Sequence, residues 1–148
     1  MNRYEEVALE YITANPYNYV NTHLAIPGKN GHANNVPDIV VHNIKTNDFF
    51  VVEITSAYNI SKLLNKVKDR DTIWYFPIKK MYSKTYSDVD IFTVLFIRGD
   101  ILEKTEKFLK QNDITDVKLI TLEESCFGWK LDWKDQSDGI HYPLNPLK

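Results

Sequence analysis

The chain has 148 residues, of which 43% are apolar and 26% charged, and its formal net charge is -2. These values predict one soluble globular domain spanning residues 1–148 and exclude a uniformly basic nucleic-acid-binding protein. The single cysteine excludes an internal disulfide and a zinc site made of several thiolates. No apolar stretch approaches transmembrane length, and the first ten residues lack the apolar core of a secretory signal. We therefore expect a cytoplasmic protein with no membrane partner.

The N-terminal part begins with an amphipathic helix at residues 3–14, which is predicted from an apolar stripe at helical spacing. The stripe consists of Tyr4, Val7, Ala8, Tyr11 and Ile12. A short strand at residues 22–26 and a polar loop at residues 27–35 follow. Glu5 lies at the edge of the stripe, in the first turn, where acidic residues usually complement the helix dipole. His32 lies in the loop, where a lone histidine is usually solvated.

Residues 36–56 contain two apolar strands, at 39–44 and 49–55, joined by a polar turn. Each strand holds one carboxylate that burial alone would not select: Asp38 at the start of the first strand and Glu53 late in the second. A turn centred on residues 46 and 47 would pair Val40 with Glu53 and Asp38 with Thr55. Alternation then places six side chains on one face: Asp38, Val40, His42, Val51, Glu53 and Thr55. Asp38 and Glu53 become diagonal neighbours, roughly 7–8 Å apart at the backbone. Two carboxylates at that separation repel each other unless a cation lies between them.

The second half of the chain is expected to add helices and further strands. The predicted elements are a helix at 57–70, strands at 73–76 and 91–97, a helix at 99–111, a strand at 117–122 and a last strand within 128–133. The alternation of strands and helices predicts an α/β domain with a mixed central sheet and helices packed on its faces.

Basic residues are concentrated between positions 61 and 84, although the chain as a whole is slightly acidic. The candidates for binding a phosphate backbone are Lys62, Lys66, Arg70, Lys79 and Lys80. The alternative interpretation is a solvated helix face and loop that bind nothing.

The pattern Pro37-Asp38, then fourteen residues, then Glu53-Ile54-Thr55 resembles the signature of the PD-(D/E)XK nuclease superfamily. The similarity covers roughly the first half of the chain. The predicted order of elements also matches the αβββαβ core of that superfamily, so the resemblance implies a restriction-endonuclease-like fold. Thr55 stands where the family usually has a lysine.

The resemblance implies a nuclease that depends on Mg²⁺ or Mn²⁺ and hydrolyses phosphodiester bonds. Its metal ligands would be Asp38, Glu53 and the Ile54 carbonyl, with Glu5 reaching the metal from the first helix. Most members cut DNA, so DNA is favoured over RNA as the partner, in a homodimer or a larger nucleoprotein complex.

The missing lysine leaves two interpretations open. A lysine on the following helix, Lys66 or Lys62, takes over the catalytic charge while Thr55 only faces the metal; Lys66 is preferred because it lies deeper along the helix. This arrangement resembles the viral cap-snatching endonucleases, in which a histidine also binds metal, a role that His32 would fill. Alternatively the site is inactive, and the chain is a nuclease-fold nucleic-acid-binding or adaptor protein in a transposition, restriction or viral complex. A serine hydrolase motif and a phosphate-binding glycine loop are both absent from the sequence.

Overall fold

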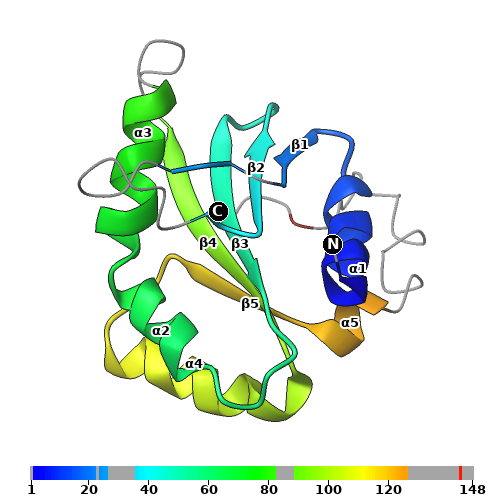
Figure 1. The fold of residues 1–148 in the computed structure, drawn as a ribbon, viewed down its shortest axis with the longest axis vertical. Coiled ribbons are helices and arrows are strands. Elements are labelled where there is room, and N and C mark those ends of the chain that lie inside the picture. Colours follow the sequence, from blue (N-terminus) through cyan, green and yellow to red (C-terminus); the bar gives the residue numbers. More distant parts are fainter. Residues whose placement is uncertain (1, 23, 27–35, 83–88, 127–143, 145–148) are drawn as a thin grey trace, which may run out of the picture.

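Five strands form one mixed sheet with helices on both faces in the computed structural model of the chain, which describes residues 2–22, 24–26, 36–82, 89–126 and 144 (Figure 1). The strands are β1 (Asn18–Asn21), β2 (Ile39–Asn43), β3 (Asp48–Ile54), β4 (Asp90–Ile97) and β5 (Val117–Thr121). Their order in the sheet is the order in the sequence. The pairs β1–β2 and β2–β3 are antiparallel, whereas the pairs β3–β4 and β4–β5 are parallel. The predicted α/β class with a mixed central sheet is confirmed.

The helices precede, connect and follow the strands of this sheet. They are α1 (Arg3–Thr13), α2 (Ser61–Lys68), the π-helix η2 (Asp71–Tyr75), α3 (Phe76–Tyr82), the 3₁₀ turn η3 (Gly99–Ile101), α4 (Leu102–Gln111) and α5 (Leu122–Cys126). The order of elements through β4 therefore follows the predicted helix, three strands, helix and strand. Within the described ranges, no helix combines the length and the apolar character that crossing a membrane would require.

The central strand β3 determines the two layers of the core, because it is buried on both faces. Phe50 and Val52 pack with Ala8 of α1 in one cluster, which also contains Leu122 of α5. The alternate residues of β3 belong to the opposite cluster, together with α2, η2, α3 and α4. Alternation along the strand thus assigns α1 and α5 to one face and the longer connections to the other, as Figure 1 shows.

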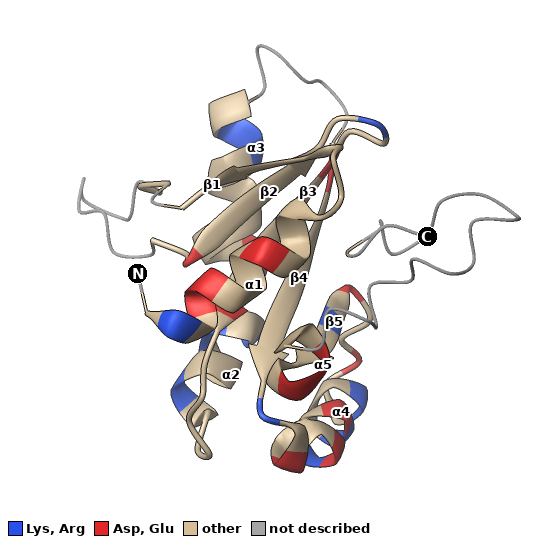
Figure 2. Cartoon of the chain, turned by 90° about the vertical axis from the view of Figure 1, so that its right-hand side faces the viewer, with Lys and Arg blue, Asp and Glu red and all other residues tan. Residues whose placement is uncertain are grey.

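The two faces also differ in charge. Acidic residues lie in the first turns of α1 and α5, whereas α2 and α3 end with basic residues and have no acidic residue in the first turn (Figure 2). On the same layer as α2 and α3, α4 has Glu103 in its first turn and Lys110 in its last. The basic residues of the segment 61–84 that the structure describes therefore lie on the layer formed by α2 and α3.

The register of the β2–β3 hairpin corrects the predicted pairing. Val40 pairs with Val51, not with Glu53, and the ladder ends at Ile39 opposite Val52. The same register extended by one residue places Asp38 opposite Glu53. The predicted pairing of Asp38 with Thr55 is therefore wrong by two residues. Because the shift is an even number, the predicted set of side chains on one face is kept. The correction brings Asp38 and Glu53 from diagonal to directly opposed positions.

The turn itself explains this register. The side chain of Asn43 accepts hydrogen bonds from the backbone N–H groups of Lys45 and Thr46, both at 3.1 Å. Asn47 has a φ of 61°, in the left-handed region that asparagine tolerates. The strands therefore close at the pair Asn43–Asp48 around a four-residue turn.

Three other expectations differ from the structure. Residues 73–76, predicted as a strand, are helical, because the π-helix η2 runs directly into α3 and buries Trp74 and Ile78 in the core. The first strand is Asn18–Asn21 rather than residues 22–26. The helix expected at 57–70 begins only at Ser61. The strand expected within 128–133 lies outside the described residues.

Candidate functional site

The acidic pair lies at the end of the β2–β3 hairpin opposite its turn. Glu53 is the penultimate residue of β3 and is only 9% exposed. Asp38 directly precedes β2, and its Oδ2 accepts a hydrogen bond of 2.8 Å from the backbone N–H of Ile54. The two carboxyl groups also lie within hydrogen-bonding reach of each other. Asp38 is thus fixed on the strand that carries Glu53, and the pair has one defined geometry.

Burial and the neighbouring carboxyl change the titration of this pair. Desolvation is the largest of the effects that raise the pKa of Glu53 from 4.5 to about 9, and the hydrogen bond and negative charge of Asp38 raise it further. The positive charge of Lys66 acts in the opposite direction and lowers this pKa. At neutral pH the Glu53 carboxyl therefore keeps its proton.

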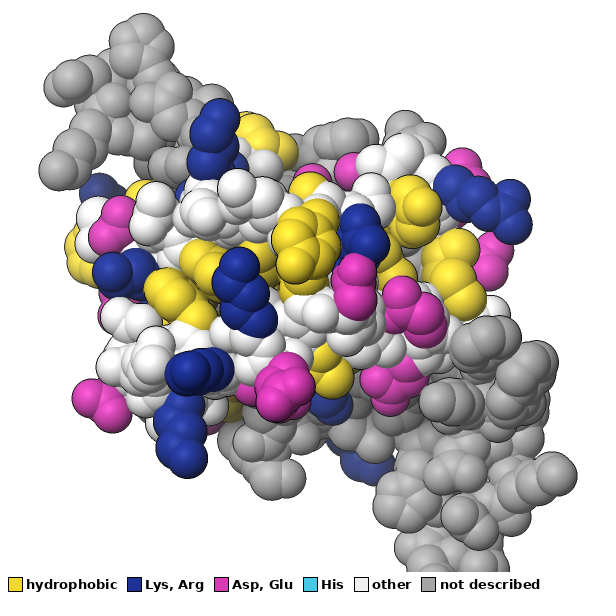
Figure 3. Space-filling model, turned by 90° about the horizontal axis from the view of Figure 1, so that it is seen from below, with side chains coloured by type: hydrophobic (Ala, Val, Ile, Leu, Met, Phe, Trp, Pro, Cys, Tyr) yellow, Lys and Arg dark blue, Asp and Glu magenta, His cyan; other side chains and the backbone are white. Residues whose placement is uncertain are grey.

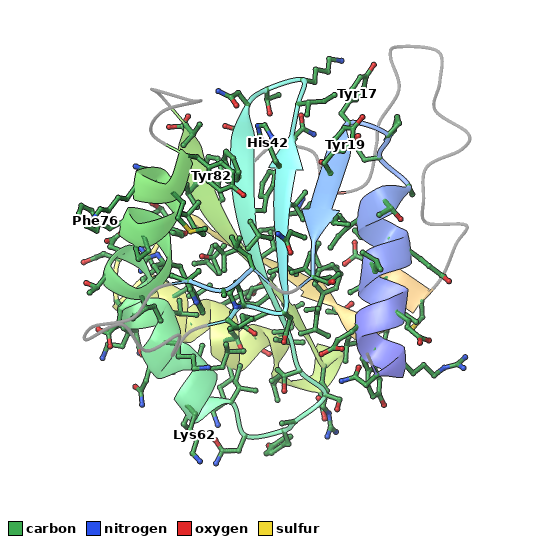
Figure 4. All side chains as sticks on the ribbon, turned by 45° about the horizontal axis from the view of Figure 1, so that its top comes forward. Tyr17, Tyr19, His42, Lys62, Phe76 and Tyr82 are labelled. Atoms are coloured by element: carbon green, nitrogen blue, oxygen red, sulfur yellow. The ribbon has the colours of Figure 1, made fainter. Side chains whose placement is uncertain are left out.

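The two candidate lysines of α2 lie in different places. Lys66 is close enough to Glu53 for its charge to lower the pKa of that carboxyl. Lys62, one turn earlier, instead lines a groove of about 510 Å³ and points outward from the first turn of the helix in Figure 4. Of the two, the structure brings Lys66 to the acidic pair, whereas Lys62 lies beside the exit from β3.

Thr55 and Ile54 complete the immediate surroundings. The Thr55 N–H donates to the carbonyl of Phe96 at 3.0 Å, and its hydroxyl accepts from the N–H of Ala57 at 3.1 Å. The threonine thus shapes the exit of the chain from β3. In an extended strand, the N–H and C=O of one residue point to the same side. Since the Ile54 N–H points to Asp38, its carbonyl oxygen lies on that side as well.

These groups form an oxygen-rich donor set that suits a hard divalent cation. Two carboxylates and one backbone carbonyl match the ligands that Mg²⁺ and Mn²⁺ use, with water and substrate oxygen in the remaining positions. Glu53 is buried and Asp38 is half-buried, and a cation between them would offset the repulsion of two ionised carboxylates. The residues therefore fit the metal that the resemblance implies.

Glu5 and the histidines do not join this set. The Glu5 carboxylate accepts from the backbone N–H of Asn2 at 3.0 Å, in a capping box at the start of α1, and α1 covers the other face of the sheet. In the described ranges, no third aspartate, glutamate, histidine or cysteine completes a metal-binding group. His42 stacks on Phe49 at 4.3 Å near the hairpin turn, and His32 lies outside the described residues.

The basic candidates divide in the same way. Arg70 forms a bidentate ion pair with Asp116, with contacts of 2.6 and 2.8 Å. Asp116 also accepts a hydrogen bond from the Tyr75 hydroxyl at 2.7 Å. The Arg70 guanidinium therefore ties the end of the α2 segment to the loop before β5. Lys79 and Lys80, by contrast, lie on the exposed side of α3.

Sequence reasoning missed two residues at the same edge of the sheet. Tyr58, in the connection from β3 to α2, is 62% exposed, and the Arg98 guanidinium lies 5.6 Å from the centre of its ring. Arg98 directly follows β4. The signal that would have found them is their position after the carboxyl ends of two adjacent parallel strands, where open α/β sheets bind ligands.

Comparisons with known proteins add no relative. No protein-family model matches the chain, and neither a curated protein nor a solved structure matches it. The functional argument therefore depends on the residues and geometry of the site.

Proposed function

We propose that this protein is a metal-dependent nuclease of the PD-(D/E)XK type that cleaves DNA internally. The observation that carries the proposal is the carboxyl pair at the end of the β2–β3 hairpin: Asp38 accepts from the Ile54 N–H at 2.8 Å, and the neighbouring Glu53 is 9% exposed. A buried carboxyl such as Glu53 has no value for packing, since it costs free energy to desolvate. Its position at the carboxyl end of the central strand is where this class of sheet binds its ligands.

Each residue has a distinct part in the proposed reaction. Asp38, Glu53 and the Ile54 carbonyl would hold Mg²⁺ or Mn²⁺, with both carboxyl groups deprotonated. The ion would supply charge neutralisation at the scissile phosphate and a lowered pKa for the attacking water. Lys66 stabilises the negative charge that develops on the phosphate oxygens, the role that a lysine at position 55 has in the family. Thr55 carries no charge and positions the chain at the exit from β3.

The charge distribution supports a nucleic-acid partner that approaches from the α2 and α3 side. The described lysines Lys62, Lys66, Lys79 and Lys80 lie on these two helices, whereas α1 and α5 carry acidic first turns on the other face. A phosphate backbone is attracted to the first surface and repelled by the second. Arg70 is engaged with Asp116 and contributes to the fold of this surface instead.

The experiment measures metal binding and cleavage with the same variants. We expect calorimetry to detect Mn²⁺ binding by the wild type and by Asp100→Asn, a control at an exposed aspartate, but not by Asp38→Asn. We expect the wild type to cut DNA in the presence of Mn²⁺, and Glu53→Gln to abolish the cleavage. Cleavage that survives Glu53→Gln would show that another site or a contaminant is responsible. Mn²⁺ binding without cleavage of any single- or double-stranded DNA or RNA would favour the inactive adaptor.

A further inference from the structure

A groove opens at the edge of the sheet where β3 and β4 end, immediately beyond the acidic pair. The Thr55 N–H bonds to the Phe96 carbonyl at 3.0 Å, so the two strands leave the sheet side by side. The groove has a volume of about 510 Å³, within the range of pockets that hold small ligands. Its lining residues are Thr55, Asn59, Ile60, Ser61, Lys62 and Leu63. Figure 3 looks onto the underside of the molecule as drawn in Figure 1, where apolar side chains run across the middle of the surface with basic and acidic side chains next to them.

Tyr58 stands beside this groove, since it directly precedes the lining residue Asn59. Tyr58 is 62% exposed, so much of its apolar surface is accessible to a partner. Arg98 lies over the ring at 5.6 Å, and two contacts with Asp100, at 3.0 and 2.6 Å, hold the guanidinium. The edge thus combines an exposed aromatic ring, a positioned guanidinium and the lysine Lys62.

We propose that this edge binds an unpaired nucleotide of the strand to be cut, with its base stacked on Tyr58 and its phosphate near Lys62. This inference rests on the proposed nuclease function and names its substrate as single-stranded DNA. An exposed aromatic ring stacks on a base only when the face of that base is free, which a duplex does not allow.

The charges of the molecule support the single strand as well. Duplex recognition covers a large area and neutralises many phosphates, whereas this chain has a net charge of -2 and an acidic opposite face. Stacking provides affinity that does not depend on a broad basic surface. A short unpaired segment therefore fits the few cations at this edge, Lys62, Lys66 and Arg98.

The test measures binding without cleavage. Glu53→Gln serves as the background, and no metal is added, so that the readout does not depend on the chemistry. Fluorescence anisotropy at low ionic strength compares a labelled oligothymidine with a duplex of the same length. Adding Tyr58→Ala should weaken binding of the single strand about tenfold, within the range for one base–aromatic stack, and leave the duplex unaffected. Tyr58→Phe, which keeps the ring, should bind as the background does.

Tyr19→Ala is the matched control, because Tyr19 is 61% exposed and lies on the edge strand β1, far from Lys62 in Figure 4. It should leave binding unchanged. Three results would each overturn the stacking proposal. They are an equal loss of affinity in Tyr58→Ala and Tyr19→Ala, an equal loss of affinity for the single strand and the duplex in Tyr58→Ala, and no binding of the single strand by the background protein. Metal-dependent cleavage that Glu53→Gln abolishes and Tyr58→Ala leaves intact would refute this inference while the nuclease proposal stands. Conversely, loss of single-strand binding in Tyr58→Ala would support it even if no cleavage is found.

Discussion

The raised pKa of Glu53 should make the stability of the protein fall as the pH rises through neutrality. In the unfolded chain the Glu53 carboxyl loses its proton near pH 4.5, but in the folded protein burial raises its pKa to about 9. Below pH 4.5 both states hold the proton, and between the two values only the folded state does. The free energy of unfolding is therefore highest at low pH with respect to this group, and it decreases as the pH rises towards 9.

The size of the effect follows from one proton per molecule. Each pH unit between the two pKa values changes the free energy by 2.303RT for each proton taken up, so the step from pH 6 to pH 8 costs about 3 kcal/mol. The Glu53→Gln variant has a neutral amide, whose N–H can donate to Asp38 as the protonated Glu53 carboxyl does. The variant therefore removes the part of the pH dependence that Glu53 causes. The other titrating groups are the same in both proteins and cancel in the comparison.

The assay is urea unfolding of both proteins at pH 6, 7 and 8, followed by tryptophan fluorescence, since Trp74 is buried in the core. The wild type should lose about 3 kcal/mol relative to Glu53→Gln over this interval. Added Mn²⁺ should stabilise the wild type more at pH 8 than at pH 6, because it binds the pair without its proton. Parallel pH profiles for the two proteins would show that Glu53 ionises normally, and the account of the buried pair would be wrong.

Two further predictions concern charges elsewhere on this layer. Lys66→Ala should slow single-turnover cleavage about 10²–10³-fold with little change in Mn²⁺ affinity. Lys62→Ala should weaken substrate binding and leave the cleavage rate at saturating substrate near that of the wild type. Equal cleavage rates for the two variants would refute the role of Lys66. Asp116→Ala should lower the free energy of unfolding by about 2–3 kcal/mol, because it leaves the largely buried charge of Arg70 with the Val67 carbonyl but without its carboxylate partner. The matched change Asp100→Ala removes an exposed ion pair and should cost less than about 1 kcal/mol in the same denaturation experiment; similar losses would contradict the distinction.

The sequence was sufficient for the class of fold and for the acidic pair, because both depend on simple alternation. The strand β3 reads as an apolar run with Glu53 as an exception, and alternate residues must face opposite layers whatever the turn. Asp38 and Glu53 were therefore predicted on one face. Their direct opposition was not, since it depends on Asn43 capping the turn and on the left-handed backbone of Asn47. Such side-chain chemistry shifts a register without changing the apolar pattern.

Residues 73–76 and Tyr58 show where pattern reasoning stops. Ile-Trp-Tyr-Phe is a short apolar and aromatic run, which a buried strand and a buried helix share. Tertiary packing decides for the helix, because Trp74 and Ile78 enter the core as the π-helix passes into α3. Tyr58 carried no pattern at all, since its significance comes from Arg98, which lies far along the chain and next to it in space.

The hydrogen bond from the Ile54 N–H to Asp38 means that the hairpin ends on a side chain instead of a strand carbonyl. The Asp38 carboxylate is therefore both the acceptor of the last hydrogen bond of the hairpin and a member of the acidic pair. A change in the charge that Asp38 presents, by a proton or a cation, alters the strength of that hydrogen bond as well as the chemistry of the site. The rate at which the Ile54 amide exchanges its hydrogen with solvent thus reports the chemical state of the two carboxyl groups through the backbone, independently of any substrate.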